Sequence, residues 1–162
     1  MDGSEEFDEF YRGTAQRLVR YAYGLTADPA EAQDLAQEAY ARAWHHWKRV
    51  RAYDLPEAWL RTVVTRLATD RWRRISLRRT RPQPVLEATP PPGDDRMFVA
   101  SLLVGLPLEQ RRAMALHYLS DLSVDQVAAE MKANPNTVKS WLSRGRAALA
   151  ARLAEQGEID VY

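Results

Sequence analysis

The sequence predicts an all-α protein made of two small helical domains joined by a proline-rich linker. Apolar residues recur at helical spacing through most of the 162 residues, and patterns typical of β-strands are almost absent. Between residues 75 and 95 the periodicity stops, and five of the nine prolines fall there. Proline runs favour stretched polyproline geometry, so this stretch is predicted to be a semi-extended linker. The expected boundaries are a first domain at 1–75, the linker at 76–95, a second domain at 96–155 and an acidic tail at 156–162.

Three helices are predicted in the first domain. One runs from about residue 5 to residue 25. Asp28 is a plausible N-cap, and Pro29 a first-turn residue, for a second helix that runs to about Trp47 with Trp44 and Trp47 facing inward. After a loop at 48–55, Pro56 opens a third helix that ends near Arg74. The outer face of that third helix is expected to carry arginines, namely Arg61, Arg66, Arg71, Arg73 and Arg74.

The second domain is predicted to begin with two short helices between residues 96 and 119. A helix-turn-helix follows at 121–149. Ser123 and Gln126 form the pattern of a capping box at the start of its first helix. Pro135 suits the first turn of its second helix. The acidic tail is short and is expected to be frayed.

The second helix of a helix-turn-helix enters the major groove of duplex DNA, with its N-terminal residues at the base edges. Here Val138, Leu142 and Leu149, joined by Trp141, fall on the inner face. The outward side carries polar and basic residues: Asn136, Thr137, Lys139, Ser140, Ser143 and Arg144. Taken alone, the stretch also fits a plain αα-hairpin with a polar surface.

Charge is unevenly distributed, although the net charge is only +1. Residues 1–47 carry −5, residues 48–81 carry +8, and residues 82–162 carry −2. An acidic block beside a basic block indicates two partners of opposite charge, or one surface divided between them. The arginines of the basic block can neutralise phosphates and release counterions. The sequence therefore favours a polyanion as one partner.

Aromatic residues are interleaved with these arginines. Tyr53, Trp59 and Trp72 offer faces on which unpaired bases can stack, although core packing is the simpler role for Trp59. On the second helix, polar residues spaced three and four apart share one face, which is either an ordinary surface or a protein-docking face. That face consists of Asp34, Gln37, Glu38 and Arg42.

Patterns typical of enzymes and metal sites are scarce. The chain has no cysteine, which rules out disulfides and cysteine chemistry. His45 and His46 are adjacent, so on a helix they lie about 100° apart and cannot share a face as zinc ligands do. Neither of the glycine-rich phosphate-binding motifs occurs. We expect a binding protein without enzymatic activity, metal or cofactor.

The chain is expected to lie in the cytoplasm. No stretch approaches the ~18 consecutive apolar residues of a membrane helix. The first ten residues are acidic and lack the apolar core of a secretory signal. The absence of cysteine suits a reducing compartment.

Three parts of the sequence resemble the extracytoplasmic-function sigma factors of bacterial RNA polymerase. Residues 30–44, AEAQDLAQEAYARAW, look like the AEDLxQExFxxxW signature of the family's region 2. Residues 58–65, AWLRTVVT, followed by DRWRR at 70–74, resemble a later part of the same region. Pieces between residues 106 and 146, including TVKS and RGR, resemble region 4. The proline-bearing linker and the Trp-rich region 2 are similar to the actinobacterial SigE-like group.

The resemblance implies a promoter-specificity subunit that works with core RNA polymerase and promoter DNA. Its polymerase partners would be the β′ clamp helices and the β flap, with the linker threading toward the active-site cleft. Asp34, Gln37, Glu38 and Arg42 would dock on the clamp helices. The −35 element would be read by the outward residues of the recognition helix named above. The −10 element would be opened and held by Tyr53, Asp54, Arg61, Thr65, Arg71, Arg73 and Arg74.

The chain departs from the family pattern at two positions. Thr65 stands where many members carry Asn, and Val50 stands where many carry an aromatic residue that can grip a flipped base. The pocket for that base is therefore left open, with Tyr53 as a substitute. An anti-sigma protein is a further candidate partner, and the sequence does not show whether one exists. The alternative function is a stand-alone helix-turn-helix regulator, which would not need the docking face or the basic third helix.

Overall fold

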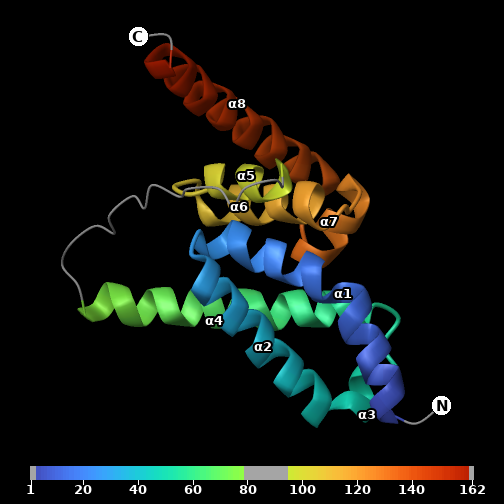
Figure 1. The fold of residues 1–162 in the computed structure, drawn as a ribbon. Helices are drawn as coiled ribbons and strands as arrows, with labels where there is room; N and C mark the ends of the chain where they lie inside the picture. Colours follow the sequence, from blue (N-terminus) through green and yellow to red (C-terminus); the bar gives the residue numbers. More distant parts are fainter. Residues whose placement is uncertain (1–2, 79–94, 161–162) are drawn as a thin grey trace.

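The computed structural model describes residues 3–78 and 95–160, and within these ranges it contains helices and turns but no strand (Figure 1). The all-α prediction is thus confirmed. The α1–α4 unit consists of α1 (Gly3–Thr26), α2 (Pro29–His45), α3 (Trp47–Val50) and α4 (Pro56–Arg78). The α5–α8 unit consists of α5 (Asp95–Leu102), α6 (Leu108–Met114), the π-helix η1 (Ala115–Leu119), α7 (Val124–Met131) and α8 (Pro135–Asp160). Most of the predicted linker, residues 79–94, lies outside the described residues.

The start of α2 follows the capping pattern expected from the sequence. The Asp28 carboxylate accepts hydrogen bonds from the backbone N–H groups of Ala30 and Glu31, at 3.0 and 3.3 Å, and Pro29 occupies the first turn. These bonds satisfy two donors that would otherwise lack a partner at the helix start. The far end differs from the prediction, because α2 ends at His45 and the short α3 occupies the first part of the expected loop.

Trp44 does not face inward as predicted, since its side chain is 51% exposed. The inner side of α2 at this level is already filled by Phe7, whose ring centroid lies 5.2 Å from Trp47 and 6.4 Å from Tyr40. The Trp44 ring packs on Phe7 from outside, with 5.2 Å between centroids. Helical spacing could not show that the two tryptophans compete for one place.

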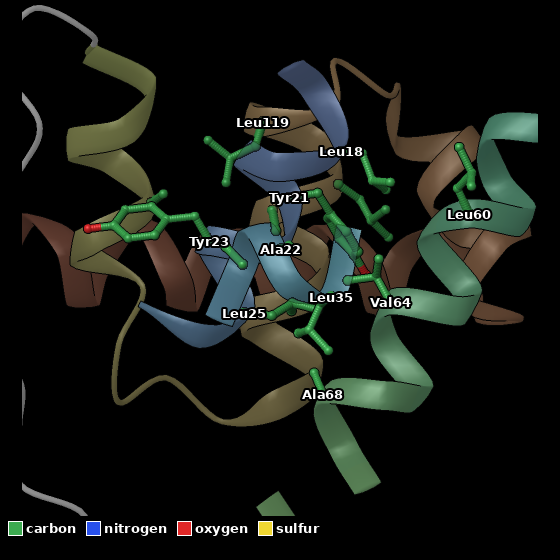
Figure 2. Packing of buried hydrophobic residues seen from close by; sticks show 14 of the residues in the cluster. Leu18, Tyr21, Ala22, Tyr23, Leu25, Leu35, Leu60, Val64, Ala68 and Leu119 are labelled. Atoms are coloured by element: carbon green, nitrogen blue, oxygen red, sulfur yellow. The ribbon is translucent and has the colours of Figure 1, made fainter. Parts of the chain in front are cut away.

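Helix α1 lies between the other helices of its own unit and the α5–α8 unit (Figure 1). On one side it packs on α2 and α4, and on the other on α5, α6 and η1. Figure 2 shows Leu119 of η1 on the opposite side of α1 from Val64 and Ala68 of α4. All three side chains are buried in one continuous apolar cluster, which also contains Leu18 and Tyr21 of α1. The sequence predicted two domains but gave no sign that they share a core.

The helix-turn-helix has the predicted capping box. The Gln126 N–H donates to the Ser123 hydroxyl at 3.1 Å, and the Ser123 N–H donates to the Gln126 side-chain oxygen at 2.9 Å. Lys132 ends α7 in the left-handed conformation, with φ 53°. The Asn134 side chain then accepts from the Asn136 N–H at 2.9 Å, which caps α8. The turn therefore aims the first turn of α8 by local hydrogen bonds.

The end of the chain differs from the prediction of a frayed tail. Helix α8 continues to Asp160 and projects beyond the rest of the α5–α8 unit (Figure 1). About three turns from its start, α8 approaches α6 closely, because a Cβ added to Gly145 would lie 2.6 Å from Met114. Glycine at this position lets the recognition helix seat directly on the unit's core.

Candidate nucleic-acid interface

The recognition helix α8 presents one continuous polar surface. Val138 and Leu142 are buried, and Trp141 and Leu149 are half-buried, as the apolar spacing predicted. The six candidate base-contacting residues are all exposed: Asn136, Thr137, Lys139, Ser140, Ser143 and Arg144. Arg146 is exposed on the same helix and donates to the Tyr118 hydroxyl at 3.2 Å. The surface combines amide, hydroxyl and cationic donors, which are the groups that read base edges and phosphates.

The polar face of α2 is likewise exposed. Asp34, Gln37, Glu38 and Arg42 are brought together on it. Arg42 donates to the Glu38 carboxylate at 3.1 Å, one helical turn away. The Gln37 amide donates to the Tyr11 hydroxyl of α1 at 3.2 Å. Gln37 and Tyr11 also line a groove of about 330 Å³ between α1 and α2, so the exposed polar face borders a concave surface.

The loop before α4 is open on its outer side. Tyr53 is 41% exposed and Leu55 is 68% exposed, while Asp54 is also exposed. Val50 is completely buried at the end of α3. It therefore belongs to the core, and Tyr53 is the exposed aromatic side chain of this loop.

Arg61 is not on an outer face as predicted, because its relative exposure is only 6%. Its guanidinium donates to both carboxylate oxygens of Glu130 on α7, from Nη2 to Oε1 at 2.7 Å and from Nε to Oε2 at 3.0 Å. Helical periodicity correctly placed Arg61 away from the core of the α1–α4 unit. It could not show that the second unit covers that side.

Thr65 is half-buried and takes part in a hydrogen-bond chain. Its hydroxyl donates to the Arg61 carbonyl oxygen at 2.8 Å and lies 2.6 Å from the Tyr21 hydroxyl. Since the Thr65 proton is used for Arg61, Tyr21 is the donor to Thr65. Burial raises the pKa of Tyr21, and the Arg112 guanidinium of the other unit opposes that rise. Tyr21 thus remains a neutral donor in the middle of the molecule.

At the basic end of α4, some side chains are exposed and others pack against the rest of the protein. Arg73 and Arg74 are exposed, whereas Arg71 is half-buried. Trp72 packs under the guanidinium of Arg111 on α6, with 5.7 Å from the Arg111 Cζ to the ring centroid. A ring held by a cation from α6 is not an open stacking platform.

Three residues of the interface between the units were missed by sequence reasoning. Glu130 pairs with Arg61, Gly24 lets η1 approach α1, and Arg111 donates to the Gly24 carbonyl oxygen at 2.7 Å. Burial lowers the pKa of Arg111 to about 10, and nearby Arg152 adds to that shift. None of the three breaks the apolar spacing of its own helix, so the sequence held no signal for them.

Two negative findings concern only the described part of the chain. Within residues 3–78 and 95–160, no group of three or more His, Asp or Glu side chains is arranged to hold a metal ion. No helix in these ranges is long and apolar enough to cross a membrane.

Comparisons with known proteins match both units. The family model for Sigma-70 region 2 matches residues 10–78, and that for Sigma-70, region 4 matches residues 99–149. The chain is 32% identical over 152 residues to the RNA polymerase sigma-E factor of Streptomyces coelicolor, covering 91% of this chain and 86% of that protein. It is also 32% identical over 156 residues to the ECF RNA polymerase sigma factor SigL of Mycobacterium tuberculosis, covering 91% and 88%.

A solved structure has the same fold. The sigma factor RpoE of Bartonella quintana, crystallised with the anti-sigma factor NepR, superposes with a TM-score of 0.67 at 23% identity, over 90% of this chain and 97% of that chain. The expected likeness to the actinobacterial SigE group is also confirmed by the Streptomyces and Mycobacterium relatives. With both family regions present in order, and with relatives matched over most of their length, the chain belongs to the extracytoplasmic-function sigma factors of bacterial RNA polymerase.

Proposed function

We propose that this chain is a promoter-specificity subunit, which binds core RNA polymerase and directs it to promoters through their −10 and −35 elements. One observation carries the proposal: regions 2 and 4 of the family occur in one chain, each with its own exposed polar surface. A repressor would need only the helix-turn-helix. The second polar surface, on α2, has no role in such a protein.

The α2 face is the proposed docking site for the β′ clamp helices. Asp34, Gln37, Glu38 and Arg42 are exposed there, and the Glu38–Arg42 pair and the Gln37–Tyr11 hydrogen bond hold three of them in place. Preorganised polar groups lose little side-chain entropy on binding, which favours affinity. The β flap is proposed as a second polymerase contact, for the α5–α8 unit.

The −10 element is proposed to bind along α4 and the loop before it. Tyr53 offers an exposed ring for an unpaired base, and Asp54 lies beside it. Arg73 and Arg74 are exposed for phosphate contacts, with Arg71 close to them in sequence. Thr65 and Arg61 complete the set proposed from the family resemblance. Arg61 is bound to Glu130 of α7 here, so its DNA contact requires a different arrangement of the units, whereas Thr65 is bound within the α1–α4 unit, to Tyr21 and to the Arg61 carbonyl oxygen.

The −35 element is proposed to bind the first three turns of α8. Arg144 is suited to a bidentate contact with guanine, and Asn136 to one with adenine, while Lys139 suits a phosphate. Thr137, Ser140 and Ser143 add hydroxyls that bind either bases or backbone. This division predicts that Arg144 influences which sequence is chosen more than Lys139 does.

Three further statements follow from the proposed function. The chain is expected to supply recognition, while the polymerase supplies the chemistry, so it is not itself an enzyme. Its place of work is then the cytoplasm, where the polymerase and the genome are. An anti-sigma protein is a candidate partner, because the chain has the fold of a sigma factor that was crystallised with one.

Run-off transcription tests the proposal. Core polymerase with this chain should give promoter-dependent transcripts on some members of a promoter panel, and core polymerase alone should not. The Asp34→Ala and Gln37→Ala variants should lose core binding in a pull-down, whereas Asp125→Ala, an exposed change on α7, should not. Absence of any promoter-dependent transcript, together with tight binding of the free chain to a palindromic duplex, would support the repressor function instead.

A further inference from the structure

We propose that Arg61 is a switch residue, whose guanidinium holds the free chain closed through Glu130 and is released to promoter DNA only when the two units separate. The release of Arg61 to promoter DNA rests on the proposed function. The closure through Glu130 rests on contacts between helices that lie far apart in the sequence.

The Arg61–Glu130 pair joins the two units directly. Arg61 lies on α4 and Glu130 on α7, 69 residues later. The guanidinium makes contacts of 2.7 and 3.0 Å with the two carboxylate oxygens. The side chains are only 7% and 11% exposed. Two-point, charge-assisted hydrogen bonds of this length are among the stronger ones in proteins.

Further polar contacts surround the pair. Arg61 also lies 3.9 Å from Glu57, and Glu57 binds Arg17 of α1 at 2.8 Å, so charges of alternating sign run from α1 through α4 to α7. A second bond between the units runs from the Arg111 guanidinium of α6 to the Gly24 carbonyl oxygen of α1. The closed arrangement is therefore built from specific polar contacts as well as apolar burial.

Closure covers the beginning of the proposed −10 surface. A cavity of about 320 Å³ separates the start of α4 from α7, and Leu55 and Ala58 line it on one side and Leu122 and Ala129 on the other. Arg61 and Glu130 lie at the same cavity. While α7 is in this position, the Arg61 guanidinium cannot reach a phosphate or a base.

The spacing of promoter elements gives an independent reason for opening. Elements at −10 and −35 are about 25 base pairs apart, or roughly 85 Å at ~3.4 Å per base pair. In the closed chain the two units share one apolar core and touch through Arg61 and Glu130. One molecule in this state cannot reach both elements, so promoter recognition needs the units to separate.

The pair is suited to act as a switch because its two states differ in solvation. A buried charge that loses its partner is strongly unfavourable, whereas the same charge in water or on a phosphate is not. Glu130→Gln keeps the side chain's shape but removes its charge, so in the closed state Arg61 loses its ionic partner at 2.7 Å and keeps only Glu57 at 3.9 Å. In the open state Arg61 loses no partner. The closed state should become less populated, and Arg61 should become available to DNA.

Energy transfer between two dyes measures the closure. The chain has no cysteine, so Glu9→Cys on α1 and Ala150→Cys on α8, both exposed positions, give two defined labelling sites. The free chain should show a closed population, and saturating core polymerase should remove it. Glu130→Gln should raise the open-to-closed ratio of the free chain by about tenfold or more. Asp125→Asn, which removes a charge from an exposed position of the same helix, is the matched control.

Three outcomes would overturn the inference: a free wild-type chain that is open, a Glu130→Gln variant as closed as the wild type, or equal opening by Asp125→Asn. Circular dichroism shows whether the chain keeps its total helix content, so unfolding is not mistaken for opening. Free Glu130→Gln should also bind a forked −10 DNA probe several-fold more tightly than the wild type. Run-off transcription by the wild type tests the proposed function separately, because an open chain that transcribes would refute the switch alone.

Discussion

Gly24→Ala tests the packing between the two units. Gly24 lies on α1 at the contact with η1, and a Cβ built there would meet the Leu119 Cδ1 at 2.7 Å and the Ala115 Cβ at 3.3 Å. Carbon atoms in optimal contact are ~3.5–4.0 Å apart, so the units must separate by about 1 Å or repack. Overpacking of this kind typically costs about 1–3 kcal/mol.

The change acts on the closed state specifically. Alanine favours helix over glycine by up to ~1 kcal/mol, but α1 is helical in both states, so this gain cancels from the opening equilibrium. A penalty of about 1–3 kcal/mol confined to the closed state raises the open-to-closed ratio by about 5- to 150-fold.

The assay is energy transfer in the doubly labelled free chain. Gly13→Ala is the matched control, because its Cβ would meet nothing within 4 Å. Gly24→Ala should lower the transfer while Gly13→Ala leaves it unchanged. Equal transfer in the two variants, with helix content intact, would refute the claim that η1 packs directly on α1.

Three further predictions concern recognition, local stability and pH. Arg144→Ala should cost about 1–3 kcal/mol of discrimination between the native and a scrambled −35 element in transcription assays, and equal loss on both templates would count against base contact. Asp28→Ala should lower the free energy of unfolding by about 1 kcal/mol in a urea titration, since it removes the cap from two N–H groups, and no change would contradict that cap. Burial raises the pKa of Tyr40 to about 12. The unfolded chain therefore loses this proton first, and stability should fall as pH rises from about 10 toward 12. Tyr40→Phe should remove that part of the decline, and identical pH dependence in variant and wild type would rule it out.

Elements with local causes were predictable from the sequence. Asp28–Pro29, the Ser123–Gln126 capping box and the start of α8 at Pro135 all depend on residues within a few positions of each other. The inner face of α8 follows from apolar spacing, which depends only on helical geometry. These features were confirmed because no distant contact competes with them.

Features that depend on distant contacts were not predictable. Arg61 was expected on an outer face, and it is outward with respect to its own unit, yet Glu130 covers it from α7. Trp44 was expected on the inner face, but Phe7 and Trp47 fill that space and Trp44 packs on Phe7 from outside. For Arg61 periodicity gave the correct direction of the side chain relative to its own unit, whereas for Trp44 the predicted inward direction was wrong. Periodicity held no information on what else would occupy that direction.

Site-specific crosslinking tests the central claim, that two units of one chain read two separated elements of a promoter. A photocrosslinking residue would replace Tyr53 in one sample and Ser143 in another, and each chain would be assembled with core polymerase on the same promoter fragment. We predict crosslinks from Tyr53 near −10 and from Ser143 near −35, about 25 base pairs or roughly 85 Å apart. Crosslinks from both positions to the same site, or from Ser143 to two half-sites about 10 base pairs apart as in a dimeric repressor, would contradict the account.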